Sequence, residues 1–307
     1  MSGNNGTNNG GLDTNPNTAQ YGYVPSKALA IIFITLFIAT TLTHFVQAIR
    51  YRTWFMLFTA CLCGMIEIAG WFGRGWSGFS PSASTPFEIQ IIATIVAPTP
   101  LIAASFVIFG RIIRQLGQQY SRLRPRLYTI IFTSCDVISL VVQGFGGGVA
   151  AGADTLVGAN KGAHIMLIGI VFQLVIIIIF ASVAVDFFLR YRKDTRVGGT
   201  YGNIGKTYSN TTEGRPGELT ADLRLMIKAL IFNMSCLFIR SIYRIIELSG
   251  GWDGTVLRTQ VYFVVFDGVM VILAIYTTNI IHPGVYLASV NRKSTMSMEN
   301  LSGAGDV

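Results

Sequence analysis

The feature that most constrains this chain is a series of long apolar runs. The first, ALAIIFITLFIATTLTHFVQAI, contains no Asp, Glu, Lys or Arg between Lys27 and Arg50. A helix needs about 20 apolar residues to cross the hydrocarbon of a bilayer, so this run predicts a membrane-spanning helix. We therefore predict an all-α polytopic membrane protein with seven transmembrane helices. Their expected ranges are 28–49, 53–73, 89–110, 127–150, 163–188, 225–248 and 259–281.

The composition agrees with this class. Of the 307 residues, 51% are hydrophobic and only 12% are charged, whereas a soluble domain carries about 25% charged residues. The net charge of +8 would raise the question of nucleic acid in a soluble protein. Here the basic residues lie between the apolar runs, where they set topology and meet anionic headgroups. We expect membrane lipids as partners and no nucleic acid.

The basic residues also predict an orientation. Seventeen of the 23 lysines and arginines fall on one side of the predicted membrane domain, and that side is the cytoplasmic one by the positive-inside rule. The N-terminus is then outside and the C-terminus cytoplasmic. We expect a disordered extracellular tail over 1–26 and a membrane domain over 27–284. A mobile cytoplasmic loop at about 191–222 interrupts that domain, and a cytoplasmic tail follows over 285–307.

Polar side chains interrupt six of the seven runs, mostly in the middle or outer half of the membrane. Arg240, Arg244 and Glu247 are spaced by four and three residues, so they share one face of the sixth helix. Ionisable residues are costly in hydrocarbon and are mostly functional. We expect a polar cavity open to the outer leaflet, and ion pairs that only lock helices together are the alternative. The candidate substrate-binding residues are Glu67, Arg74, Gln90, Asp136, Gln143, Gln173, Arg240, Tyr243, Arg244, Glu247 and Asp267.

Proline and glycine mark two of the predicted helices. Pro98 and Pro100 fall inside the third and predict a kink, because proline removes helical hydrogen bonds. The segment QGFGGG at 143–148 ends the fourth helix, and its four glycines allow either close helix packing or an unwound end.

Histidines give little support for a metal site. His44 and His282 fall near the predicted inner face, where Asp186 also lies, so a zinc site there is geometrically possible. The sequence has no HxxxH or HExxH pair, and His282 is followed by Pro-Gly, which is typical of a helix end. There is also no GxxxxGK[ST] phosphate loop and no GxSxG context. We expect no metal, no cofactor and no catalytic residue.

Short motifs along nearly the whole chain resemble the fungal RTA-like family, also called the lipid-translocating exporter family. A Gly–Gln pair at 169–173 and the region of Asp267 also fit in order and spacing. The matching motifs are YGYVPS (21–26), EIAGWFGR (67–74), AP…AA…GRI (97–112), DVISLVVQGFGGG (136–148), RSIYRIIE (240–247) and HPG (282–284).

The resemblance implies a seven-span protein of the plasma membrane that exports or translocates amphipathic lipids. Sphingoid long-chain bases, sterol-like compounds and lipophilic toxic compounds are the implied substrates, and resistance to them is the implied outcome. A long-chain base has a cationic amine, which Glu67, Asp136 or Asp267 could bind while Arg240 and Arg244 keep those carboxylates charged.

Two other functions stay open. The first is a seven-span receptor or lipid sensor, although GRIIRQ stands where a DRY-like triplet is expected after the third helix and the seventh lacks NPxxY. The second is a metal-dependent lipid hydrolase of the ceramidase type. The sequence leaves the lipid, the direction and energy source of transport, the protein partners and the oligomeric state undetermined.

Overall fold

The computed structural model describes residues 21–153, 155–195, 219–252 and 254–286, and all regular structure in these ranges is helical. Seven helical segments are long and apolar enough to cross a membrane. The predicted all-α class and the seven spans are therefore confirmed. The orientation, with the N-terminus outside, stays a prediction from the basic residues.

Four of the seven spans are single helices and three are interrupted. The single helices are α1 (Lys27–Arg50), α5 (Pro125–Ala151), α6 (Leu156–Arg192) and α8 (Ala221–Ser249). The second span joins a 3₁₀ turn (Trp54–Met56), a π-helical turn (Leu57–Cys61) and α2 (Leu62–Ser77). The third joins α3 (Ser84–Val96) to α4 (Pro98–Leu116), and a 3₁₀ turn follows at Gln118–Tyr120. The seventh joins α9 (Gln260–Phe263), a π-helical turn (Val264–Val269) and α10 (Met270–Ile280), before the short α11 (Pro283–Tyr286).

Several helices extend beyond the predicted apolar runs. The fifth span was expected at 163–188, but α6 has 37 residues, about 55 Å at 1.5 Å per residue. That length exceeds the hydrocarbon core of roughly 30 Å, so the polar ends of α6 reach beyond it. Hydropathy locates only the hydrocarbon part of such a helix. Several helices begin at a residue whose side-chain hydroxyl caps the N-terminus. At the start of α6, the side chain of Thr155 accepts a hydrogen bond from the backbone N–H of Gly158.

The predicted boundary between the N-terminal tail and the membrane domain differs from the structure. Residues 21–26 were assigned to a disordered tail, but Tyr21 is buried and its hydroxyl lies 3.3 Å from that of Ser77. Aromatic packing against Phe87 holds this segment on the bundle. The rest of that predicted tail, most of the loop at about 191–222 and most of the tail at 285–307 lie outside the described residues.

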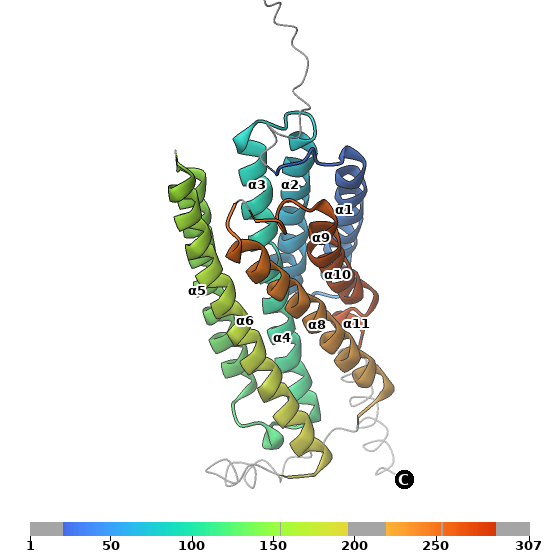
Figure 1. Ribbon diagram of the computed structural model, residues 1–307. Helices are drawn as coiled ribbons and strands as arrows, with labels where there is room; N and C mark the ends of the chain where they lie inside the picture. Colours follow the sequence, from blue (N-terminus) through green and yellow to red (C-terminus); the bar gives the residue numbers. More distant parts are fainter. Residues whose placement is uncertain (1–20, 154, 196–218, 253, 287–307) are drawn as a thin grey trace, which may run out of the picture.

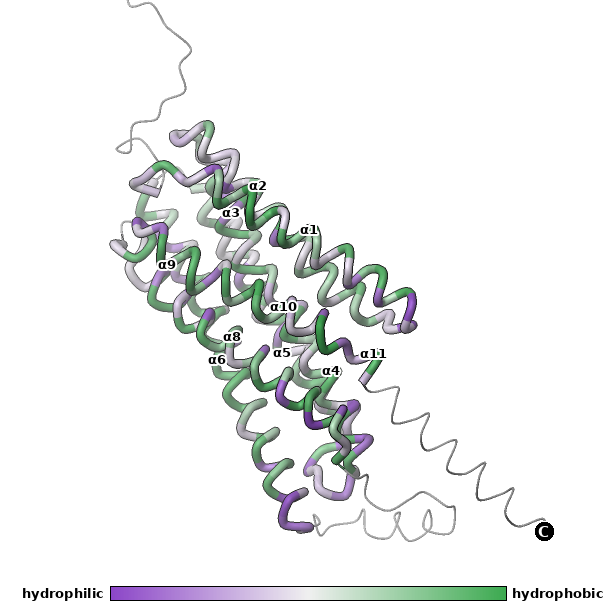
Figure 2. The backbone as a smooth tube through the Cα atoms, turned by 90° about the vertical axis from the view of Figure 1, so that its right-hand side faces the viewer, coloured by the Kyte–Doolittle hydropathy of each residue, from purple (hydrophilic) through white to green (hydrophobic). Residues whose placement is uncertain are grey.

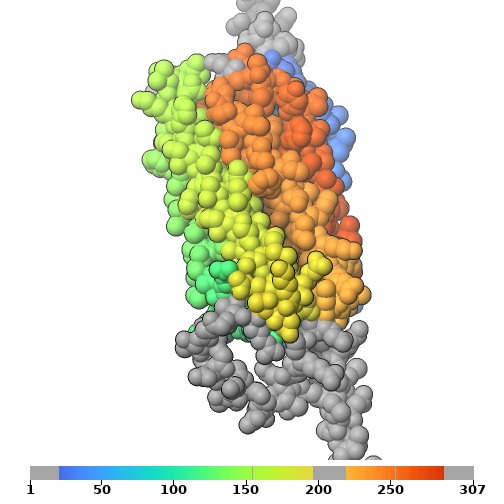
Figure 3. All heavy atoms as spheres, turned by 60° about the horizontal axis from the view of Figure 1, so that its bottom comes forward, coloured from blue at the N-terminus to red at the C-terminus, as the bar shows by residue number. Residues whose placement is uncertain are grey.

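The helices form one bundle, with the α5–α6 hairpin on one side and α1 on the other (Figure 1). The third span is the most enclosed, with 72% of its apolar window buried, against 28% for α1 and 33% for α5 and for α6. Figure 3 shows α6 and α8 in contact along one face of the bundle. The third span is therefore the element that most of the polar side chains can reach.

Apolar side chains cover the outside of the bundle, as a lipid-facing surface requires. Ile31, Leu42, Val141, Phe145 and Ile168 are each at least 60% exposed. Figure 2 shows hydrophobic residues along the helices, while hydrophilic residues gather toward helix ends such as those of α1 and α6.

The proline and glycine predictions have clear outcomes. The third span is interrupted at Ala97, between the end of α3 and Pro98 at the start of α4. The glycine-rich segment does not unwind, because α5 stays helical to Ala151. Gly146 brings α5 and α6 together, because a Cβ there would lie 2.6 Å from the backbone nitrogen of Met166, whereas Gly144 and Gly148 meet nothing within 4 Å. Close packing is therefore the role of Gly146, and of Gly147 against Ile92.

Candidate functional site

The charged face of α8 meets the seventh span in a buried ionic cluster. Asp267, in the π-helical turn, accepts two hydrogen bonds from Arg244, from Nε at 2.9 Å and from Nη2 at 2.8 Å. Arg244 Nη1 donates to Glu247 Oε2 at 2.6 Å, and the hydroxyl of Tyr243 donates to Glu247 Oε1 at 2.8 Å. All four side chains are at most 5% exposed. The spacing of Arg240, Arg244 and Glu247 thus places all three on the face of α8 that contacts Asp267 or its partner Arg244.

Arg240 connects this cluster to the interruption in the third span. Its Nε lies 2.8 Å from Asp267 Oδ1, an ion pair without the alignment of a hydrogen bond. Its Nη2 donates to the backbone carbonyl of Thr94. That carbonyl would ordinarily accept from the residue four positions later, which is Pro98, and proline has no N–H. The arginine therefore satisfies a carbonyl that the proline leaves free.

Arg74 lies nearer the end of the bundle where α1 begins, inside an aromatic cage. Its Nη2 donates to the hydroxyl of Tyr23 at 2.7 Å, and its Nη1 donates to Gln90 Oε1 at 3.1 Å. The guanidinium carbon lies 4.4 Å from the ring centre of Phe263 and 5.3 Å from that of Tyr21. Burial raises the pKa of Tyr21 and that of Tyr23, so both phenols stay neutral. The cage anchors the segment before α1 through a cation.

Glu67 is the unpaired member of the ionic cluster. It is fully buried on α2, and neither carboxylate oxygen has a hydrogen-bond donor among the described residues. Its charged neighbours are Asp267, Arg240 and Arg244. Trp71 is also near, but its indole N–H does not align with the carboxylate. A polar side chain in a dry core is normally hydrogen-bonded, so Glu67 has an unused binding capacity.

The remaining predicted residues form a second network, built on amides, between α4, α5 and α6. Gln173 Nε2 donates to Asp136 Oδ1 at 2.7 Å and to Thr99 Oγ1 at 3.2 Å. Gln143 Nε2 donates to Gln173 Oε1 at 3.1 Å and to Ser139 Oγ at 2.7 Å. The second oxygen of Asp136, Oδ2, has no hydrogen-bond partner in the described part of the chain.

Nine of the eleven predicted residues are thus brought together in two groups, not around one water-filled cavity, and Arg74 and Gln90 lie apart in the aromatic cage. The third span serves both: Thr94 near the end of α3 contacts the ionic cluster, and Thr99 near the start of α4 contacts the amide network. Most of the polar atoms bond to each other, as the alternative of locking ion pairs expected. Only Glu67 and Asp136 keep carboxylate oxygens without a described donor.

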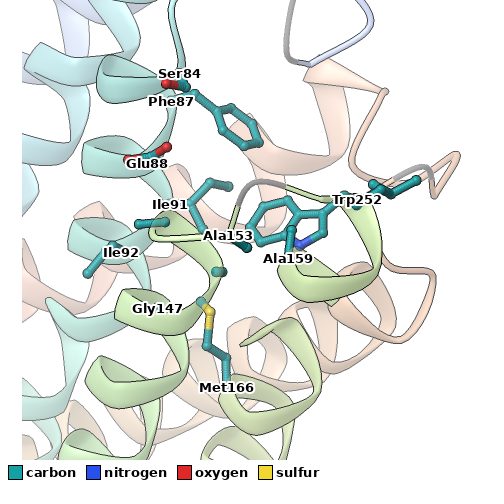
Figure 4. Close-up of a pocket in the computed structure, with 13 residues that line it drawn as sticks. Ser84, Phe87, Glu88, Ile91, Ile92, Gly147, Ala153, Ala159, Met166 and Trp252 are labelled. Carbon is teal, nitrogen blue, oxygen red and sulfur yellow. The ribbon is translucent and has the colours of Figure 1, made fainter. Parts of the chain in front are cut away.

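An open cavity lies elsewhere, at the end of the bundle where α1 begins. It has a volume of about 190 Å³, and its walls come from α3, α5, α6 and the segment after α8 (Figure 4). None of the eleven predicted residues lines it. Sequence reasoning missed Glu88 and Trp252, which do. Glu88 opens the third span and could have been found by its position, whereas Trp252 carries no comparable signal.

The described residues do not assemble the zinc site of His44, His282 and Asp186. The rings of His44 and His282 lie 6.4 Å apart between their centres. Asp186 does not join them, because it pairs with Arg122 and Arg190 at 2.9 Å each. Among the residues that the structure describes, no three His, Cys, Asp or Glu side chains gather as metal ligands.

Comparisons with known proteins give the relationship. The chain is 28% identical over 290 residues to the sphingoid long-chain base transporter RSB1 of Saccharomyces cerevisiae, a match that covers 88% of this chain and 75% of the relative. It is 26% identical over 293 residues to protein RTM1 of the same organism, covering 83% and 88%. Protoporphyrin uptake protein 1 of S. cerevisiae is 24% identical over 293 residues, covering 83% and 89%.

No solved structure matches the chain. Residues 60–289 match the family described as RTA1 like protein, which is well over half of the sequence. These residues include the ionic cluster, the amide network and the cavity at the end of the bundle where α1 begins. The chain belongs to the family of RTA1-like membrane proteins.

Proposed function

We propose that this protein binds amphipathic lipids with a cationic head, of the sphingoid long-chain base class, and moves them across the membrane. Export from the plasma membrane would confer resistance to such compounds. The substrate class is suggested by the relative named as a long-chain base transporter, whose match covers 88% of this chain. This chain is also similar to a protein named for protoporphyrin uptake, so the direction of transport differs among its relatives.

The observation that carries the proposal is the charge balance of the ionic cluster. Two guanidinium groups, on Arg240 and Arg244, face three carboxyl groups, on Glu67, Glu247 and Asp267. With all of them ionised, the cluster has a formal charge of −1. A protonated amine would neutralise it, and Glu67 offers two oxygens without a described donor. Asp136 offers a further oxygen, Oδ2, which has no donor among the described residues.

The same helices contain the interruptions that a moving site needs. Asp267 lies in a π-helical turn, a feature often found at functional sites. The third span is broken at Pro98, next to the Thr94 carbonyl that Arg240 binds. Movement at these two places would open the cluster without unfolding a regular helix. We propose that the remaining predicted residues hold this arrangement: Arg74, Gln90, Gln143, Gln173 and Tyr243.

The test is translocation of a labelled long-chain base across vesicles that contain the purified protein. We expect faster movement than in protein-free vesicles, and a loss of this gain in Glu67→Gln. Glu67→Asp keeps the charge and should retain part of it. A fatty acid of the same chain length is the control substrate. Equal rates with and without the protein, in vesicles where it is folded and inserted, would contradict the function.

A further inference from the structure

The cavity at the end of the bundle where α1 begins is a candidate site that the buried networks do not include. It lies between α3, α5 and α6, and the loop after α8 closes one side (Figure 4). Its walls are mostly apolar, with Phe87, Ile91, Ile92 and Met166 among them. The α5 wall consists of Gly147 and alanines, and Gly147 lets Ile92 of α3 pack closely on α5, because a Cβ there would lie 2.9 Å from the Ile92 side chain. This shape suits part of an alkyl chain.

Two polar groups at the cavity have unused bonding capacity. Glu88 lines it from α3 and is partly exposed, and no hydrogen bond or ion pair links it to any other described residue. Trp252 lines it from the loop after α8, and its indole N–H is buried without a partner among the described residues. A carboxylate and an N–H donor thus border one apolar hollow.

The charge decides which ligand fits. A carboxylate at the edge of an apolar site favours a cation and repels a fatty acid or a phosphate. The volume of about 190 Å³ is below the roughly 300–1,000 Å³ of ordinary ligand pockets. The cavity can therefore take a headgroup and its first carbons, while the rest of a long alkyl chain stays in the membrane hydrocarbon.

We propose that this cavity is the binding site for the head of a single-chain amphiphile with a protonated amine. Glu88 pairs with the amine, and the indole N–H of Trp252 donates to a neighbouring hydroxyl of the ligand. Phe87, Ile91 and Met166 contact the first carbons. The site deepens the proposed function as the place where a base is held at the membrane surface before it reaches the buried carboxylates. Binding here can be measured without transport.

The experiment uses the full chain in lipid nanodiscs, with a brominated long-chain alkylamine as a fluorescence quencher. The fluorescence of Trp252 is obtained by subtracting the emission of Trp252→Phe from that of the wild type. We expect saturable quenching by the amine and none by a brominated alkyl sulfate of the same length. Glu88→Gln should weaken apparent binding about tenfold, equivalent to about 1.4 kcal/mol, and Glu88→Asp should restore most of it. Ala159→Phe, which fills the cavity, should abolish it.

The outcomes separate the site from the proposed function. Equal quenching by the sulfate, or unchanged binding in both Glu88→Gln and a folded Ala159→Phe, would overturn the site. Long-chain base translocation could then still proceed, with its entry elsewhere. Conversely, amine-selective quenching that depends on Glu88, in a protein that moves no base, would leave the site standing and reject transport.

Discussion

Asp267 should be the side chain whose charge matters most for the stability of the bundle. Its two oxygens accept from Nε and Nη2 of Arg244 at 2.9 and 2.8 Å, and Oδ1 also lies 2.8 Å from Nε of Arg240. In Asp267→Asn an NH2 group replaces one carboxylate oxygen, so that a donor then faces a guanidinium N–H. Arg240 then has no carboxylate within ion-pairing distance among the described residues.

The expected loss follows from this burial. Removing one partner of a buried ion pair costs about 3–5 kcal/mol, because the other charge is left without compensation. Glu247→Gln is the matched comparison, since Arg244 keeps both bonds to Asp267 and loses one charge-assisted bond, worth about 1.5–3 kcal/mol. Asp186→Asn, in the exposed pairs with Arg122 and Arg190, should change stability by at most about 1 kcal/mol.

The assay is reversible unfolding of the purified protein in mixed micelles, followed by tryptophan fluorescence. Trp71 is a suitable reporter because it is fully buried and stacks on Phe33 with 3.9 Å between the ring centres. We expect the free energy of unfolding to fall most in Asp267→Asn, less in Glu247→Gln and least in Asp186→Asn. A loss in Asp267→Asn no larger than that in Asp186→Asn would refute the reasoning.

Two further predictions concern packing and the amide network. In Gly162→Ala the new Cβ would lie 2.4 Å from the backbone nitrogen of Ala150, so thermal unfolding should show a loss of about 1–3 kcal/mol. Gly148→Ala, which meets nothing within 4 Å, is its control and should be neutral or stabilising. Gln173→Leu removes the donor to Asp136 Oδ1 and should cost about 1–3 kcal/mol. Adding Asp136→Leu should recover most of that loss, and no recovery would mean that the network is not the cause.

The spans and the polar face of α8 could be predicted from the sequence because each depends on local pattern. Apolar length gives the helices, and the spacing of Arg240, Arg244 and Glu247 places them on one side. The partners could not be predicted in the same way. Asp267 reaches both arginines from a π-helical turn, and no local pattern in VVFDGV distinguishes that turn from an ordinary helix.

The expectation of one wetted cavity was wrong for a physical reason. Depth in the membrane was estimated from helix ends, and depth alone does not give the direction in which a side chain points around the bundle. Glu67 and Asp267 lie beside the arginines of α8. Asp136 and Gln173 lie in a different place, beside Thr99 of α4. The cavity lies instead between α3, α5 and α6, where small residues such as Ala150, Ala151 and Ala159 line its wall.

Competition binding tests the central claim most directly, which is that this chain selects amphiphiles with a cationic head. The measurement is equilibrium binding of a tritiated long-chain base to the purified protein, with unlabelled competitors of equal chain length. An alkylamine should displace the base in a saturable way, and a fatty acid should not. Equal displacement by the fatty acid, or no saturable binding of the base to folded protein, would contradict the claim.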